Sequence, residues 1–188
     1  MTIGGANVPL FFISPGQINF QVPYFNATGL TPANLTITEG TLTTTVTVTI
    51  TPYAPGVYTT NSQGTGQASA IIAGTATIPS ASGAFPGSRP AQKGEFVSLY
   101  CTGLGAVRNR PGLGAPSPSS PLALTTTMPL VTVGGVNASV SFSGLAPFYV
   151  GLYQVNVQVP ANAPSGDAVP VILSIGGVTA NTVTIAVQ

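Results

Sequence analysis

The segment QINFQVP at residues 17–23 returns as QVNVQVP at residues 154–160, 137 positions further along the chain. Polar and apolar residues alternate in both segments, which is the period of a half-buried β-strand. A proline closes each segment, and proline cannot continue a central strand. Two such similar strands so far apart indicate an internal repeat.

Three further pairs of segments repeat, two of them at the same spacing and one at a spacing of 130. The pair nearest the N-terminus has the shorter spacing, 130 instead of 137. The second copy therefore carries seven extra residues around Phe148 to Tyr153, which we expect to form a longer loop. The pairs are EG at 39–40 with GG at 176–177, TVTV at 45–48 with TVTI at 182–185, and TIGGAN at 2–7 with TVGGVN at 132–137.

Turn residues separate short alternating segments throughout the chain. The 23 glycines and 18 prolines make a long amphipathic helix untenable. Many short strands in a repeat of about 100 residues predict an immunoglobulin-like (Ig-like) β-sandwich, although the Trp and paired Cys of antibody domains are missing. The predicted fold is all-β, with two tandem Ig-like sandwich units, the first lacking its opening strand or strands. The predicted strands are 17–22, 34–38, 43–50, 154–159, 169–175 and 182–187.

The two copies are unequal. The second copy is preceded by a strand-like segment at 94–103, and nothing similar precedes the first copy. We therefore divide the chain into an incomplete unit, residues 1–53, and a complete unit, residues 54–188. A missing strand leaves an open sheet edge, through which we expect the chain to self-associate. Whether residues 59–90, rich in Gly, Ser and Ala, form strands or a linker stays open at this point.

Charged residues are scarce: four Lys or Arg and three Asp or Glu, 4% of the chain against about 25% in typical soluble domains. So few cations cannot form the patch that neutralises phosphates, and nucleic acid is therefore not an expected partner. Because 44% of the residues are hydrophobic, the chain is expected to fold. A nearly neutral surface repels its copies only weakly, which again favours self-association.

The sequence predicts no membrane span, since no segment approaches 18 consecutive apolar residues. Its first residues, MTIGG, lack the basic and hydrophobic regions of a signal peptide. The composition nevertheless favours a secreted, extracellular or cell-surface protein. Met1 is therefore interpreted as an artificial start or as the edge of a larger parent protein.

Residues able to do chemistry are few and scattered. The chain has no histidine, and Glu39, Glu95, Asp167 and Lys93 fall in separate turns or at a strand start. Cys101 alternates with aliphatic neighbours and is predicted to be a buried thiol. One Cys and no His cannot form a zinc site, and no acidic loop suits calcium. We predict no enzyme, with no catalytic, cofactor-binding or metal-binding residues.

The inserted loop carries the candidate contact residues Phe148, Tyr149 and Tyr153. These aromatic side chains could stack on a sugar or contact another protein. In the alternative interpretation, Tyr153 belongs to the core while Phe148 and Tyr149 cap the end of the sandwich. Three segments, 26–28, 34–36 and 137–139, also fit the Asn-x-Ser/Thr glycosylation pattern, which is common in Thr-rich strands.

Four motifs, in this order, resemble one family: FISPGQINFQVP at 12–23, APGVY at 54–58, LYCTGLG at 99–105 and VGLYQVNVQVP at 150–160. They are similar to the Solibacter C-terminal domain, found on many large secreted proteins of acidobacteria, and the resemblance covers essentially the whole chain. It implies a secreted, surface-associated context and brings no activity and no catalytic residues. Members of that family usually carry more sequence before the first Gly-Gly motif, and this chain departs from them there.

We predict a non-enzymatic extracellular structural or adhesive module that self-assembles into oligomers or filaments by β-strand complementation. In this hypothesis, the open edge of the first unit accepts a strand from a neighbouring copy. The alternative is a carbohydrate-binding module of a secreted protein, in which Phe148 and Tyr149 contact a polysaccharide. Neither function requires a cofactor.

Overall fold

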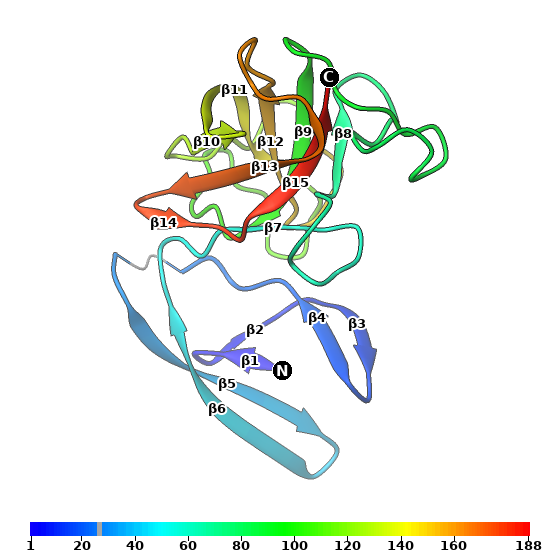
Figure 1. The fold of residues 1–188 in the computed structure, drawn as a ribbon. Helices are drawn as coiled ribbons and strands as arrows, with labels where there is room; N and C mark the ends of the chain where they lie inside the picture. The colour runs from blue at the N-terminus through cyan, green and yellow to red at the C-terminus, as the bar shows by residue number, and fades with distance from the viewer. Residues whose placement is uncertain (26–27) are drawn as a thin grey trace.

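The computed structural model describes residues 1–25 and 28–188, and this part of the chain is all-β, as predicted (Figure 1). The glycosylation pattern at 26–28 falls largely outside the described residues. Each of the six predicted strands overlaps an observed one. The strands are β1 Thr2–Ile3, β2 Ala6–Asn7, β3 Leu10–Ser14, β4 Gln17–Phe20, β5 Thr31–Glu39, β6 Leu42–Ile50, β7 Gly56–Val57, β8 Ala70–Ile72, β9 Phe96–Thr102, β10 Leu130–Val133, β11 Val136–Leu145, β12 Tyr153–Gln158, β13 Gly166–Ile175, β14 Val178–Thr179 and β15 Val183–Val187.

Residues 54–188, here called the C-terminal region, form one nine-stranded sheet that curls around an apolar core. Its order is β14-β13-β10-β11-β12-β9-β7, with β15 pairing β13 and β8 pairing β9. The sheet nearly closes on itself, because Ala68 N–H donates to the Thr184 carbonyl (2.9 Å) and Thr184 N–H donates to the Gly66 carbonyl (2.8 Å). The segment 59–90, whose role the sequence left open, therefore supplies β8 and covers the outer edge of β15.

The core of the C-terminal region is built from alternate residues of its strands. On β9, Val97, Leu99 and Cys101 are buried, while Phe96 and Thr102 at its ends are exposed. The prediction that Cys101 is buried is therefore confirmed. Each large aliphatic side chain buried in this way stabilises the fold by about 1.5–3 kcal/mol.

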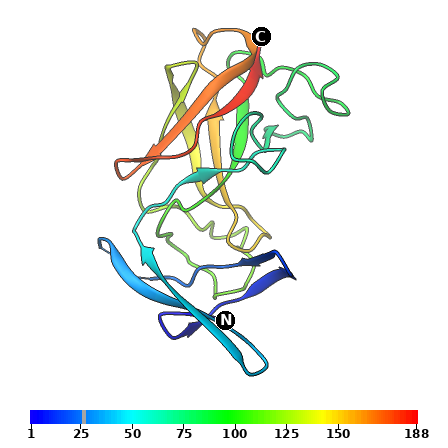
Figure 2. The same ribbon diagram turned by 60° about the horizontal axis from the view of Figure 1, so that its bottom comes forward.

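Residues 1–53, here called the N-terminal region, form two small sheets, β2-β1-β5-β6 and β3-β4 (Figures 1 and 2). Pro9 separates β2 from β3, whereas the corresponding segment of the C-terminal region is the single strand β11. A proline cannot donate to the ladder, which explains the break. The buried residues among those described in this region are Ile3, Val8, Gln21 and Pro23.

The β3–β4 hairpin follows the register of β11 and β12 at the spacings found in the sequence. Both ladders also shift register at the equivalent place, between Leu10 and Phe12 in one and between Val140 and Phe142 in the other, so the β-bulge occurs in both. The equivalent pairs are Leu10↔Phe20 and Val140↔Val157, Phe12↔Asn19 and Phe142↔Asn156, Ile13↔Ile18 and Ser143↔Val155, and Ser14↔Gln17 and Gly144↔Gln154.

The next hairpin departs from the sequence match by one residue. Its turn glycine Gly40 has φ +58° and corresponds to Gly176 with φ +57°, a spacing of 136 rather than 137. The spacing returns to 137 beyond β14, because Asn181 leaves the ladder there and binds both backbone groups of Val57 (2.8 and 2.9 Å). The extra residue of the C-terminal region is accommodated at this break.

Tyr53 fixes the junction between the two regions. Its ring lies against Gly105 and Gly176, and a Cβ at Gly176 would be 2.2 Å from the ring. Its hydroxyl shares a 2.7 Å hydrogen bond with Thr127. A second contact comes from Gln21, whose side-chain oxygen accepts the N–H of Gly114 at 2.8 Å.

Candidate functional site

The inserted loop connects β11 to β12 and is held by backbone hydrogen bonds to Ser117. Phe148 N–H donates to the Ser117 carbonyl (2.8 Å), and Ser117 N–H donates to the Tyr149 carbonyl (2.9 Å). Phe148 is 75% exposed and Tyr149 is 59% exposed. Phe148 also has φ +70°, a left-handed conformation that costs a bulky residue about 1–2 kcal/mol. Two aromatic side chains are thus presented to solvent on a pinned loop.

Tyr153 does not join this pair, because it packs against the core of the C-terminal region. Its hydroxyl donates to the Gly105 carbonyl. Burial raises the pKa of Tyr153 to about 12, and nearby Tyr24 adds to the shift. The structure therefore separates the three candidate residues into an exposed pair and a core residue.

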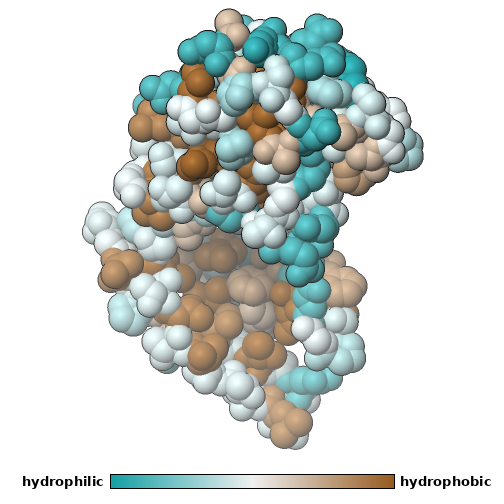
Figure 3. Space-filling model, viewed as in Figure 1, coloured by the Kyte–Doolittle hydropathy of each residue, from teal (hydrophilic) through white to brown (hydrophobic). Residues whose placement is uncertain are grey.

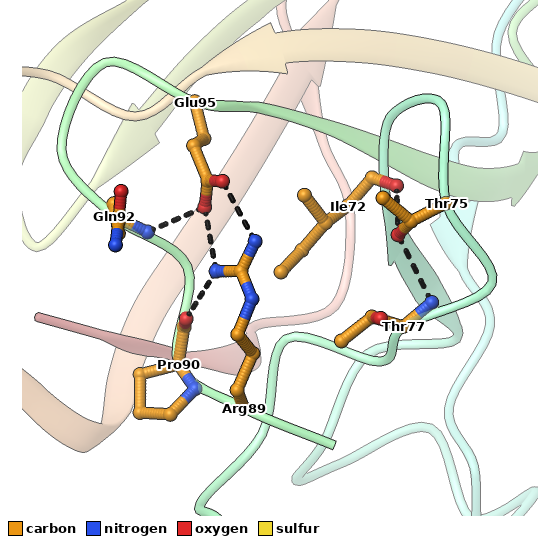
Figure 4. A network of polar contacts seen from close by, with 7 residues as sticks. All are labelled: Ile72, Thr75, Thr77, Arg89, Pro90, Gln92 and Glu95. Atoms are coloured by element: carbon orange, nitrogen blue, oxygen red, sulfur yellow. Dashed lines mark hydrogen bonds and ion pairs between the residues drawn. The ribbon is translucent and has the colours of Figure 1, made fainter. Parts of the chain in front are cut away.

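The one ion pair of residues 1–25 and 28–188 joins Arg89 to Glu95 at 2.7 Å (Figure 4). Glu95 also accepts the N–H of Gln92 (2.7 Å), and Arg89 donates to the Pro90 carbonyl (2.9 Å). The hydrogen bond from Arg89 lowers the pKa of Glu95, although partial burial opposes it. This carboxylate closes the loop that leads into β9, which is a structural role.

The other candidates for chemistry do not come together. Glu39 and Asp167 are exposed on β5 and β13. Burial raises the pKa of the Cys101 thiol to about 12, so the thiolate nucleophile is not formed near neutral pH. Within the described residues, no three His, Cys, Asp or Glu side chains are grouped as metal ligands would be.

The outer edge of β4 is the first open feature of the N-terminal region. In the C-terminal region, the equivalent strand β12 lies between β11 and β9, whereas β4 pairs with β3 and with no further strand of the described chain. A cleft of about 1130 Å³ lies beside β4 and is bounded on its far side by residues of the C-terminal region, including Val57, Tyr58 and Thr102. Figure 3 shows hydrophobic side chains in this recess and over the N-terminal region below it.

The outer edge of β6 is the second open feature. The equivalent strand β15 is covered by residues 66–68 and by Ala91, which accepts and donates hydrogen bonds there (2.9 Å each). In the described residues, β6 has only β5 as a neighbour. The sequence of β6, LTTTVTVTI, contains no charge and no proline, the residues that usually protect an edge strand.

One face of the β5–β6 hairpin is largely apolar and only partly covered. The β5–β6 hairpin has a threonine face, on which Thr36 and Thr45 share a 3.1 Å hydrogen bond. On its other face, Leu42 is 76% exposed and Val46 is 53% exposed. The apolar residues of this inner face are Ala33, Leu35, Ile37, Leu42, Val46, Val48 and Ile50, and Thr31, Glu39 and Thr44 lie on the same side.

A polar pair on β4 was missed by the sequence interpretation, although its signal was present in the repeated Gln-x-Asn. Gln17 Nε2 donates to Asn19 Oδ1 (2.6 Å), and Gln154 Nε2 donates to Asn156 Oδ1 (2.8 Å). In the C-terminal region, the same Gln154 nitrogen reaches Ser98 Oγ on β9 at 3.5 Å. The same pair is therefore present on β4, where no further strand of the described chain lies beside it.

Comparisons with known proteins yielded no match among family models, curated proteins or solved structures.

The part of the chain that the structure describes contains no helix long and apolar enough to cross a membrane.

Proposed function

We propose that the chain is a non-enzymatic, extracellular structural or adhesive module made of two tandem Ig-like sandwiches, of which the N-terminal one is incomplete. The observation that carries this proposal is the shared register of the two regions together with their unequal burial. Val171 and Val183 face each other in the core, whereas Leu35 and Val46, paired in the same way, are half-buried and exposed respectively. An apolar sheet face is stable when a second layer covers it, and that layer is supplied here by another molecule.

The proposed partner is a second copy of this chain, paired through β6. Thr47 corresponds to Thr184, whose N–H and C=O groups point away from β13 toward residues 66–68. The N–H and C=O groups of Thr47 therefore point toward the open edge. Two copies of β6 running antiparallel about Thr47 place Thr opposite Thr and Val46 opposite Val48, so both faces remain consistent.

Electrostatics does not oppose this contact. Of the seven charged side chains, only Glu39 lies in residues 1–53. Strands without edge charges pair readily with copies of themselves. The pairing unites the inner faces of two copies, and further copies or another surface then cover them.

The experiment is light scattering after size exclusion over a wide concentration range. Thr47→Lys is expected to weaken association at least tenfold, because the two introduced ammonium groups lie opposite each other at the centre of the pairing. Thr36→Lys adds the same charge to the same face one strand inward and serves as the control. A wild-type chain that stays monomeric at millimolar concentration would exclude self-association.

The exposed aromatic pair of the inserted loop favours a second candidate function, carbohydrate binding. Phe148 and Tyr149 are both largely exposed on one loop, and Phe148 has a positive φ, which in non-glycine residues is enriched at ligand sites. A polysaccharide pull-down tests this function: Tyr149→Ala should abolish retention, while Tyr58→Ala, at another exposed aromatic residue, should not. Retention unaffected by Tyr149→Ala, or no retention of the wild type, would reject it.

A further inference from the structure

The open edge of β4 has an internal template, since the equivalent strand β12 carries β9 on that side. We propose that β4 is an acceptor for one extended strand of another polypeptide with the chemistry of β9: uncharged, antiparallel to β4, with a small hydroxyl residue between two aliphatic ones. This inference rests on the proposed incompleteness of the N-terminal sandwich, but not on its self-association.

The backbone of β4 is oriented to receive such a strand. In the C-terminal region, Val159 donates to the Glu95 carbonyl (2.9 Å) and accepts from Gly94 N–H (2.8 Å), so its groups point toward the β9 side. Groups along a strand alternate in direction, and those of Val155 and Val157 therefore point the same way. Ile18 and Phe20 hold these two positions on β4. Their N–H and C=O groups consequently face the open edge.

The side chains on β4 set the pattern of the incoming strand. On the template, Leu99 and Val97 lie opposite Val155 and Val157 and are buried with them. Half-buried Ile18 and Phe20 present the equivalent inner positions, and aliphatic residues opposite them would extend the inner face. A charged residue at either position would be desolvated without a partner.

The polar side of β4 fixes the register. Ser98 lies opposite Asn156 on the template and within 3.5 Å of the Gln154 nitrogen. Gln17 and Asn19 are already joined in the same way and are both exposed. A serine or threonine opposite Asn19 would complete this group, and a shift by one residue would place an aliphatic side chain there instead.

The edge strand β6 of a second copy does not fit this acceptor. Its outward N–H and C=O groups belong to threonines such as Thr47, so pairing with β4 would place threonines opposite Ile18 and Phe20. Val46 and Val48 would then lie on the polar side, beside Asn19. The acceptor at β4 and the self-pairing edge at β6 are therefore two distinct sites with different partners.

The first test uses hydrogen exchange of the full chain with a synthetic peptide of residues 96–103, FVSLYCTG, with blocked termini and with Cys101→Ser to prevent oxidation. Protection is expected at the amides of Ile18 and Phe20, with β6 unchanged. A peptide that also carries Ser98→Val should bind about 3- to 10-fold more weakly, the loss of one hydrogen bond. Protection confined to β6, or none at β4, would overturn the inference even if the chain self-associates.

The second test traps the register by disulfide formation. Gln17→Cys in the chain should cross-link to a peptide with Tyr100→Cys, and Asn19→Cys to one with Ser98→Cys, because these residues lie opposite each other on the template. The crossed combinations should react several-fold more slowly. The chain's own Cys101 is buried and does not interfere. Equal rates in all four combinations would show contact without register and would overturn the inference.

Discussion

Val171 and Val183 face each other across β13 and β15 and are buried, whereas Leu35 and Val46 face each other across β5 and β6 in the same register and are partly or largely exposed. Because the pairing is the same and the burial differs, the register of a hairpin and the burial of its residues have different causes. Alternation and turn glycines set the register of a hairpin locally, but burial depends on the layer packed against it. In the N-terminal region, that layer covers the hairpins only in part.

Segment 56–102 of the C-terminal region has no counterpart among the described strands of the N-terminal region. It contributes β7, β8 and β9, fills the side of β12 that corresponds to the open edge of β4, and covers the edge of β15. In the described chain, no counterpart of this segment lies beside β4 or β6, and this difference accounts for both open edges and for the partly exposed face of the β5–β6 hairpin. The comparison of the two regions can be tested with paired substitutions at equivalent positions.

The largest difference is expected for core truncation. Leu173 is 0% exposed, and Ile37, its equivalent on β5, is only partly buried. Leu173→Ala should lower the free energy of unfolding by about 2–5 kcal/mol, whereas Ile37→Ala should cost about 1 kcal/mol or less because little packing is lost. Urea unfolding followed by far-UV circular dichroism measures both. Equal losses would mean that the inner face of β5 is covered in the monomer.

The turn glycines give the next comparison. Gly40 and Gly176 both have positive φ, so alanine costs about 1–2 kcal/mol at either position. At Gly176 the new Cβ would also meet the Tyr53 ring, while nothing lies within 4 Å at Gly40. Gly176→Ala should therefore destabilise by about 1–3 kcal/mol more than Gly40→Ala in thermal unfolding. Similar effects of the two substitutions would mean that Tyr53 does not hold the junction.

Local patterns in the sequence predicted much of this fold. Alternation located the strands and the burial of Cys101, and the repeated segments identified hairpins that prove to share a register. The one-residue displacement at Gly40 was not predictable, because the compensating residue is hidden in the break at Asn181. That break is held by Val57, 124 positions away in sequence. Contacts at such separation leave no local signal.

The candidate site was predicted less completely. The open edge followed from the unequal copies, but the Gln17–Asn19 pair was seen only as part of a strand pattern. The role of Tyr153 depends on the Gly105 carbonyl, which the fold brings near from 48 positions away. Side chains whose partners are distant in sequence were therefore the ones left undecided.

The smallest expected effect is a pH-dependent contribution to stability that the C-terminal region has and the N-terminal region lacks. Arg89 lowers the pKa of Glu95, so this pair stabilises the fold fully above the unfolded pKa of about 4.3, and the stabilisation is lost as pH falls through the lower folded pKa. Because the pair is partly exposed, Glu95→Gln should cost only about 1 kcal/mol at pH 7.

Glu39 carries the one charged side chain of residues 1–53 and is the matched control for Glu95. Glu39→Gln should change the free energy of unfolding by about 0.5 kcal/mol or less at any pH, as surface substitutions do. The difference between wild type and Glu95→Gln should stay constant from pH 7 to about pH 5 and shrink below about pH 4, as measured by thermal unfolding at several pH values. If the difference instead grew on acidification, Glu95 would be stabilised in its protonated form, and the loop before β9 would not be closed by an ion pair.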